Sequence, residues 1–228
     1  MNSTQFNDMW PAAAHESWLC REAYHRFQVE GQRQINAEAF GLQPTRENNI
    51  AAYSAYADFI QHLHGTYMAL FEMEVHRGYP KTPGVELHVA QDNYLRNETD
   101  RRLRGDVANQ GCSPAVPEKF GEHLRHVRNR TNHASYKRVD PAAVGQLTLQ
   151  EFYRRYHTPF VEVLYRQIAS GYLDAHSEDG KWDAIDGFSV LAGEAARKPF
   201  GLEVEIEQLG HFLTTGTSHT TLLRPEPE

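Results

Sequence analysis

Apolar residues recur at steps of three and four along most of the chain up to about residue 174, which is the spacing of amphipathic helices. The clearest case runs from Asn48 to His76. Its apolar stripe consists of Tyr56, Phe59, Leu63, Tyr67 and Leu70. Glycine and proline then end the segment, at Gly78, Pro80, Pro83 and Gly84. We expect this helix to supply the centre of a helical core.

Two weaker patterns flank this helix. A first helix is predicted from Pro11, which suits an opening turn, to Val29, with Gly31 as a stop and a short helical piece over Ile35–Phe40. Beyond residue 85 the periodicity fades and charge rises, which favours a partly exposed helix or an insertion over 85–117. The arginines of this stretch are expected on a solvated face: Arg101, Arg102 and Arg104.

Two further helices complete the pattern. One is predicted from Glu118 to Tyr136. The last follows a capping box formed by Thr148 and Glu151, and Pro159 should kink or split it. Its expected stripe is Tyr153, Tyr156, Phe160, Leu164 and Ile168. These elements predict an all-α protein with a four- to five-helix bundle over residues 1–174.

After residue 174 the chain is rich in turn-forming residues, so we expect an irregular C-terminal extension over 175–228. The stretch GLEVEIEQL within it favours a short strand pair.

Composition narrows the class of protein. With 228 residues, 40% hydrophobic and 23% charged, the chain suits one good globular core, and no apolar run approaches the roughly 18 residues of a membrane helix. The N-terminus has no secretory pattern, and Cys20 and Cys112 are not spaced as metal ligands, which favours a reduced cytoplasm. The net charge of −7 argues against a protein that coats nucleic acid.

A local excess of positive charge nevertheless lies between Lys119 and Arg138, within the helix predicted over 118–136. On a helical wheel its apolar positions share one face: Phe120, Leu124, Val127, Thr131 and Ala134. Its other side carries Arg128, Asn129, Asn132, His133 and Tyr136, which should face solvent, a ligand or another protein. We expect Arg130, near the opposite flank, to be a surface charge.

Arg128 and His133 lie roughly 140° apart on an ideal helix. One phosphate can still meet both if the long arginine swings across the asparagine face, or if the helix bends within the segment. A third arrangement pairs two copies of the helix across a two-fold axis, so that the arginine of one subunit approaches the histidine of the other.

The segment reads Arg128, Asn129, Arg130, Thr131, Asn132, His133. This Arg-Asn-x-x-x-His pattern on a late helix of a small bundle resembles the ribonuclease motif of the HEPN superfamily, an arginine followed by four to six residues and a histidine. The resemblance implies a bundle that dimerises with the motif at the subunit cleft, and a metal-independent ribonuclease without a cofactor. Many relatives of this kind act as toxins or in phage defence, so a neighbouring gene would encode an inhibitor.

The residue types fit that chemistry. Histidine moves protons near neutral pH, and a guanidinium stays charged and offers a planar fork to phosphate oxygens. His133 is therefore assigned to proton transfer and Arg128 to the phosphate. Asn129, one turn before His133, is expected to hold either the tautomer of that histidine or a phosphate oxygen. We expect the remaining polar residues to contact RNA, namely Asn132, Tyr136 and Lys137.

Two other hypotheses about the function stay open. The bundle can be non-catalytic and bind a partner protein or a nucleotide through the same polar face. It can also be a metal enzyme, because histidines and carboxylates occur one turn apart, as Glu72 with His76 and Glu122 with His126. His62 and His64 add to this set, but no Glu-x-x-His repeat is present, and His126 is expected to be buried with a hydrogen bond.

Overall fold

The structure is a computed structural model that describes residues 3–78, 84–105, 114–132, 147–171 and 173. Every regular element in these ranges is helical, which confirms the all-α class. The elements are α1 (Ser3–Ala39), α2 (Arg46–His76), α3 (Leu87–Gly105), α4 (Phe120–Asn132), α5 (Leu149–Tyr156), the π-helical η3 (His157–Val161) and α6 (Glu162–Ala169). The expected C-terminal extension and its strand pair lie outside the described residues.

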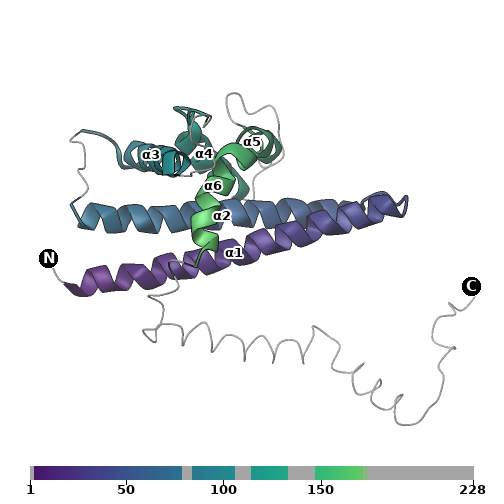
Figure 1. Ribbon diagram of the computed structural model, residues 1–228, viewed down its shortest axis with the longest axis horizontal. Coiled ribbons are helices and arrows are strands. Elements are labelled where there is room, and N and C mark those ends of the chain that lie inside the picture. Colours follow the sequence, from purple (N-terminus) through teal and green to yellow (C-terminus); the bar gives the residue numbers. More distant parts are fainter. Residues whose placement is uncertain (1–2, 79–83, 106–113, 133–146, 172, 174–228) are drawn as a thin grey trace, which may run out of the picture. The chain divides into compact units, whose positions relative to one another are not determined.

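The long helices α1 and α2 run antiparallel. Helices α3, α4 and α5 lie on one side of α2, and α6 runs from there to contact α1 (Figure 1). In the described part of the chain, no helix has both the length and the apolar character needed to cross a bilayer.

Helix α1 corrects the prediction for the N-terminal part. It begins at Ser3 rather than at Pro11 and continues through Gly31, so the separate piece over 35–40 does not exist. Small residues let α1 pack closely along α2 over many turns, and a long packed face outweighs the roughly 1 kcal/mol that one helical glycine costs. The closely packed residues are Ala13, Ala14, Cys20 and Ala23, each fully buried.

Helix α2 agrees with its predicted bounds of Asn48 and His76 to within two residues. A capping box starts it, because the Thr45 hydroxyl accepts the Asn48 amide at 3.3 Å and the Asn48 side chain accepts the Thr45 amide at 3.2 Å. The expected stripe is buried from Tyr56 to Tyr67, with Leu70 partly covered. This helix is the centre of the bundle.

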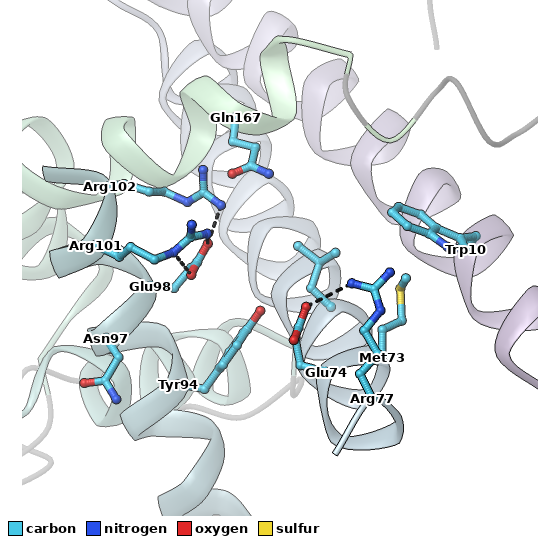
Figure 2. A pocket seen from close by; sticks show the side chains of 11 residues that line it. Trp10, Met73, Glu74, Arg77, Tyr94, Asn97, Glu98, Arg101, Arg102 and Gln167 are labelled. Carbon is cyan, nitrogen blue, oxygen red and sulfur yellow. Dashed lines mark hydrogen bonds and ion pairs between the residues drawn. The ribbon is translucent and has the colours of Figure 1, made fainter. Parts of the chain in front are cut away.

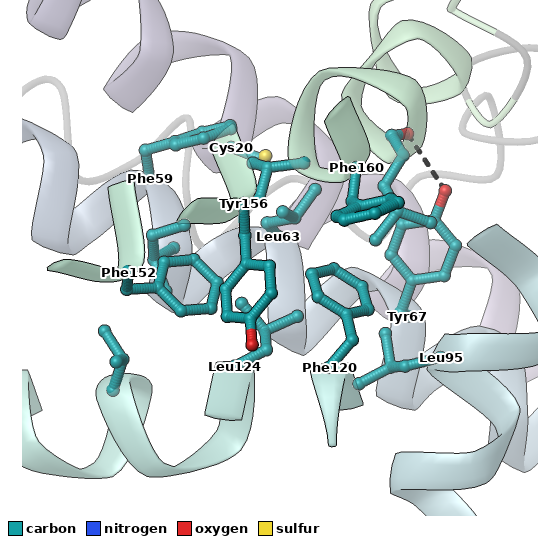
Figure 3. Close-up of a cluster of buried hydrophobic side chains, with 14 of the residues drawn as sticks. Cys20, Phe59, Leu63, Tyr67, Leu95, Phe120, Leu124, Phe152, Tyr156 and Phe160 are labelled. Atoms are coloured by element: carbon teal, nitrogen blue, oxygen red, sulfur yellow. Dashed lines mark hydrogen bonds between the residues drawn. The ribbon is translucent and has the colours of Figure 1, made fainter. Parts of the chain in front are cut away.

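The core around α2 is rich in aromatic rings (Figure 3). Phe120 and Leu124 of α4, both fully buried, lie against this cluster, as the predicted stripe requires, and Val127 and Thr131 continue it. The two tyrosine hydroxyls labelled in this cluster have partners: the Tyr67 hydroxyl donates to the Leu164 carbonyl at 2.9 Å, and the Tyr156 hydroxyl lies 2.7 Å from Nδ1 of His123. The predicted apolar stripe of α4 is therefore confirmed over the described residues.

The last helical stretch is split as Pro159 predicts. The capping box is confirmed, with the Glu151 amide donating to the Thr148 hydroxyl at 3.1 Å, and the wider π-helical turn of η3 contains Pro159. The expected stripe is wrong at one position, because Tyr153 is 39% exposed and not buried. It stacks on the buried His157 with ring centroids 4.5 Å apart and covers the core from outside.

Residues 87–105 form a regular helix, α3, which contacts α4 and α6. Arg101 and Arg104 are exposed as expected. Arg102 is not, because its side chain is only 18% exposed and pairs with Glu98. One of the three arginines therefore belongs to the interior edge of the bundle.

Two glycines give a matched test of this packing. A Cβ on Gly121 of α4 would lie 2.2 Å from the Asp92 carbonyl oxygen, whereas a Cβ on Gly31 of α1 would meet nothing within 4 Å. We expect Gly121→Ala to lower the free energy of unfolding by more than about 2 kcal/mol, because α3 and α4 must separate. Gly31→Ala should raise it by about 0.5 to 1 kcal/mol.

Urea denaturation of both variants measures these changes. Equal stability of Gly121→Ala and the unmodified protein would contradict the close approach of α4 to α3.

Candidate functional site

The candidate site lies on the flank of α4 next to α3. The apolar stripe of α4 faces the core, which turns Gly121, Arg125 and Arg128 to one side of the helix. Arg125 donates hydrogen bonds to both carboxylate oxygens of Asp92 on α3, from Nε to Oδ1 at 3.0 Å and from Nη2 to Oδ2 at 2.9 Å. The hydrogen bond to Asp92 raises the pKa of Arg125. This bidentate ion pair, together with the absence of a side chain at Gly121, fixes α4 against α3.

Arg128 follows one turn after Arg125 and is half-buried. Its Nη1 donates to the Asn129 Oδ1 at 3.0 Å, and its Nε is shielded from solvent. Within the described residues, that Nε has no acceptor and the guanidinium has no carboxylate partner. A permanently charged group held by a neutral amide in a partly dry setting favours an anion as its further partner.

A second buried polar side chain near this flank of α4 is that of His64 on α2. His64 is 6% exposed, and burial, followed by the positive charge of Arg128, lowers the pKa of its imidazole to about 4. The ring is therefore neutral at physiological pH, and its Nε2 has no hydrogen-bond partner in the described ranges. In the sequence, His64 is a candidate metal ligand only. Its spacing from Ile60 and Tyr67, one turn either way, was the available signal for burial.

The structure brings together only part of the predicted site. Arg128 and Asn129 are in contact, and Asn132 is the last residue of α4. His133, Tyr136 and Lys137 lie outside the described residues, so their roles stay predictions.

Arg130 corrects an expectation on the other flank of α4. It was predicted to be a surface charge, yet it is 8% exposed. On the helical wheel it lies at the edge of the core stripe of α4. Tertiary packing therefore covers a position that would be open on an isolated helix.

The histidines show a different distribution from the predicted one. His126 is partly exposed, with its Nδ1 4.0 Å from Glu122, so the expectation that it is buried with a hydrogen bond is wrong. The nearby His123 makes such a bond instead, its Nδ1 lying 2.7 Å from the Tyr156 hydroxyl. Among the described residues, no group of three or more histidine, cysteine or acidic side chains is placed to hold a metal ion.

Comparison of the chain with protein-family models, curated proteins and solved structures gives no match.

The burial of neutral His64 predicts how the free energy of unfolding depends on pH. The unfolded chain binds a proton at this side chain below about pH 6.5, whereas the folded protein binds it only near pH 4. The free energy of unfolding should thus fall between these values as pH falls, by up to about 1.4 kcal/mol per pH unit for each such histidine. His157, whose pKa burial also lowers to about 4, contributes in the same direction.

Urea denaturation at several pH values between 7.5 and 5 checks this. His64→Gln should reduce the slope, and the exposed control His25→Gln should leave it unchanged. An identical slope in His64→Gln and the unmodified protein would show that His64 is not held neutral by burial.

Proposed function

We propose that the protein is a metal-independent endoribonuclease in which Arg128 binds the scissile phosphate and His133 transfers a proton. The observation that carries the proposal is the state of Arg128, a half-buried guanidinium whose partner is the neutral amide of Asn129. It stands five residues before His133 in the Arg-Asn-x-x-x-His segment. The resemblance of this segment to the HEPN ribonuclease motif supports the same reading.

The reaction needs no external nucleophile. The 2′-oxygen of RNA attacks the adjacent phosphorus, its proton passes to a base, the bond from phosphorus to the 5′-oxygen breaks, and that oxygen receives a proton. The products carry a 2′,3′-cyclic phosphate and a 5′-hydroxyl. In the proposal His133 performs one of the two proton transfers, and Arg128 stabilises the negative charge that grows on the phosphate oxygens.

The other arginines of α4 are less suited to the phosphate. Arg125 is already bound by both oxygens of Asp92, so an added anion would face a neutral pair. Asn129 orients the guanidinium of Arg128 through its own oxygen. Asn132, Tyr136 and Lys137 are proposed to contact the RNA on either side of the scissile bond.

A homodimer is part of the proposal. Arg128 and His133 are roughly 140° apart on a regular helix, and a two-fold axis would let the arginine of one subunit meet the histidine of its partner. Action on cellular RNA as a toxin or defence effector, restrained by a neighbouring-gene inhibitor, is proposed from the same resemblance. A cytoplasmic location is proposed from the two widely spaced cysteines.

Cleavage of labelled RNA in the presence of chelator tests the function. We expect chelator-resistant cleavage with cyclic-phosphate ends, reduced about 100-fold or more in His133→Ala and in Arg128→Ala. Arg128→Lys should recover only a part of the activity, because an ammonium keeps the charge but loses the planar fork.

Matched controls stand on exposed positions of α3. Arg104→Ala and His88→Ala remove the same residue types from the surface, and both should retain cleavage within about twofold. Thermal unfolding of each variant separates loss of activity from loss of fold. RNA that is bound but not cut would favour a non-catalytic bundle, and cleavage only with added metal would favour a metal enzyme; either result would refute the proposal.

A further inference from the structure

A cavity of about 830 Å³, here called the aromatic cavity, lies between α1, α2 and α5. Phe27 and Gly31 line it from α1, Tyr56 lines it from α2, and Tyr153 and Arg154 line it from α5. Its volume falls within the range of small-molecule sites, and a mainly apolar lining with a few polar groups is typical of them. Its lining includes no residue of α4, so the aromatic cavity is separate from Arg128 and its neighbours.

Three rings from three helices form one wall of the aromatic cavity. The ring centroids of Phe27 and Tyr56 are 4.9 Å apart, and those of Tyr56 and Tyr153 are 5.0 Å apart, edge to face. The Tyr56 hydroxyl lies 3.1 Å from Nδ1 of the buried His157, so this polar atom already has a partner in the core. Tyr153 is exposed. The wall therefore offers ring surface, which favours a planar aromatic ligand because such rings pack offset or edge to face.

The space beside this wall is left open by a glycine. Gly31 lies inside α1, where glycine is less favourable than alanine because it loses more backbone freedom on folding. Packing does not require it there, since a Cβ at this position would meet nothing within 4 Å among the described residues. Its φ is not positive either, so alanine could adopt the same backbone. A ligand that occupies this space accounts for a glycine that the fold itself does not need.

A positive charge stands beside the aromatic wall without a carboxylate partner. Arg154 is exposed, and within the part of the chain that the structure describes its guanidinium forms no ion pair. Glu151, three residues earlier on α5, is engaged elsewhere, because its carboxylate accepts the Thr148 amide at 2.8 Å in the capping box. A guanidinium presents a planar fork that matches a carboxylate, so an anionic ligand meets complementary charge at Arg154.

The arginines of a second cavity are in a different state (Figure 2). This cavity of about 690 Å³ lies beside Trp10, with walls from α1, α2, α3 and α6. Arg101 and Arg102 both bind the Glu98 carboxylate there. Burial raises the pKa of Glu98, but hydrogen bonds from Arg101 and the charge of Arg102 lower it overall, so this carboxylate is charged. An anion would have to compete with Glu98 in that cavity, whereas at Arg154 it meets no such competitor.

We propose that the aromatic cavity binds an aromatic carboxylate. The ring of the ligand occupies the space beside Gly31, against the rings of Phe27 and Tyr153, and its carboxylate meets the guanidinium of Arg154. An aliphatic acid supplies only the charge, and a neutral aromatic molecule supplies only the ring, so each makes one of the two interactions. None of these residues lies on α4, so the proposal does not depend on RNA cleavage.

Isothermal titration of the full chain with 2-naphthoate tests the proposal. We expect this probe to bind with a Kd below about 1 mM. The corresponding alcohol keeps the rings without the charge, and octanoate keeps the carboxylate without the rings; each should bind at least about fivefold more weakly. Binding of 2-naphthoate should persist in His133→Ala, which separates this result from the outcome for the ribonuclease proposal.

Matched variants locate the site. Gly31→Leu fills the space beside the aromatic wall and should weaken binding about tenfold or more, equal to about 1.4 kcal/mol. Gln32→Leu places the same side chain at an exposed position of α1 outside the cavity, and should bind within about twofold of the unmodified protein. Arg154→Gln should weaken binding about fivefold or more, whereas Arg155→Gln, at the next exposed position of α5, should bind within about twofold.

Thermal unfolding of each variant separates loss of the site from loss of the fold. Arg154 is exposed, so Arg154→Gln tests the site even if Gly31→Leu unfolds. Absence of binding at about 1 mM 2-naphthoate would overturn the proposal. Equal affinity of Gly31→Leu and Gln32→Leu would do so as well. Loss of binding in Arg101→Gln rather than in Arg154→Gln would place the anion in the cavity beside Trp10.

A second copy of the chain is the remaining occupant that the experiment must distinguish. Sedimentation velocity of Gly31→Leu and Gln32→Leu, without any probe, compares their oligomeric states. We expect both variants to sediment like the unmodified protein. A change in Gly31→Leu alone would assign the aromatic cavity to contact between subunits and would refute the small-molecule site.

Discussion

Burial of one apolar stripe on α2 is the constraint on which the rest of the bundle depends. Phe59, Leu63 and Tyr67 are completely buried, and the neighbouring helices supply the side chains that cover them. Burying a side chain of this size contributes about 1.5 to 3 kcal/mol, so the stripe outweighs weak local preferences in the helices around it. The position of α4, and with it the environment of Arg128, follows from this packing.

The three arginines of α4 show how packing gives one residue type three different states. Arg125 meets a carboxylate of α3 and forms a bidentate ion pair that holds two helices together. Arg130 is buried at the edge of the core stripe of α4. Arg128 is half-buried against a neutral amide, in the neighbourhood of the neutral His64. Of the three, Arg128 has the environment that best suits a phosphate.

Local signals in the sequence were sufficient for much of the fold. The stripes of α2 and α4, the capping box at Thr148 and the break at Pro159 depend on residues within a turn or two of one another, so periodicity and capping chemistry predict them. Prediction was wrong where distant segments decide. Gly31 lies inside a helix because α1 packs along α2, and Tyr153 is exposed although it continues an apolar pattern.

The candidate sites show the same division. The Arg-Asn-x-x-x-His segment was visible in the sequence because its residues are contiguous. The burial of His64 and Arg130 was not, since it depends on which helix lies opposite each of them. The cavity beside Trp10 was not visible either, because its walls come from four helices far apart along the chain.

Helix α3 connects these two regions and also keeps them separate. Asp92 and Glu98 are six residues apart, so they lie roughly 120° apart around the helix and serve different faces. Asp92 pairs with Arg125 of α4, whereas Glu98 pairs with Arg101 and Arg102 of its own helix. The charge arrangement of the cavity is therefore set within α3 and does not require the contact with α4. Replacing Arg101 alters a local pair and leaves the Asp92–Arg125 pair in place, so the environment of Arg128 should be retained.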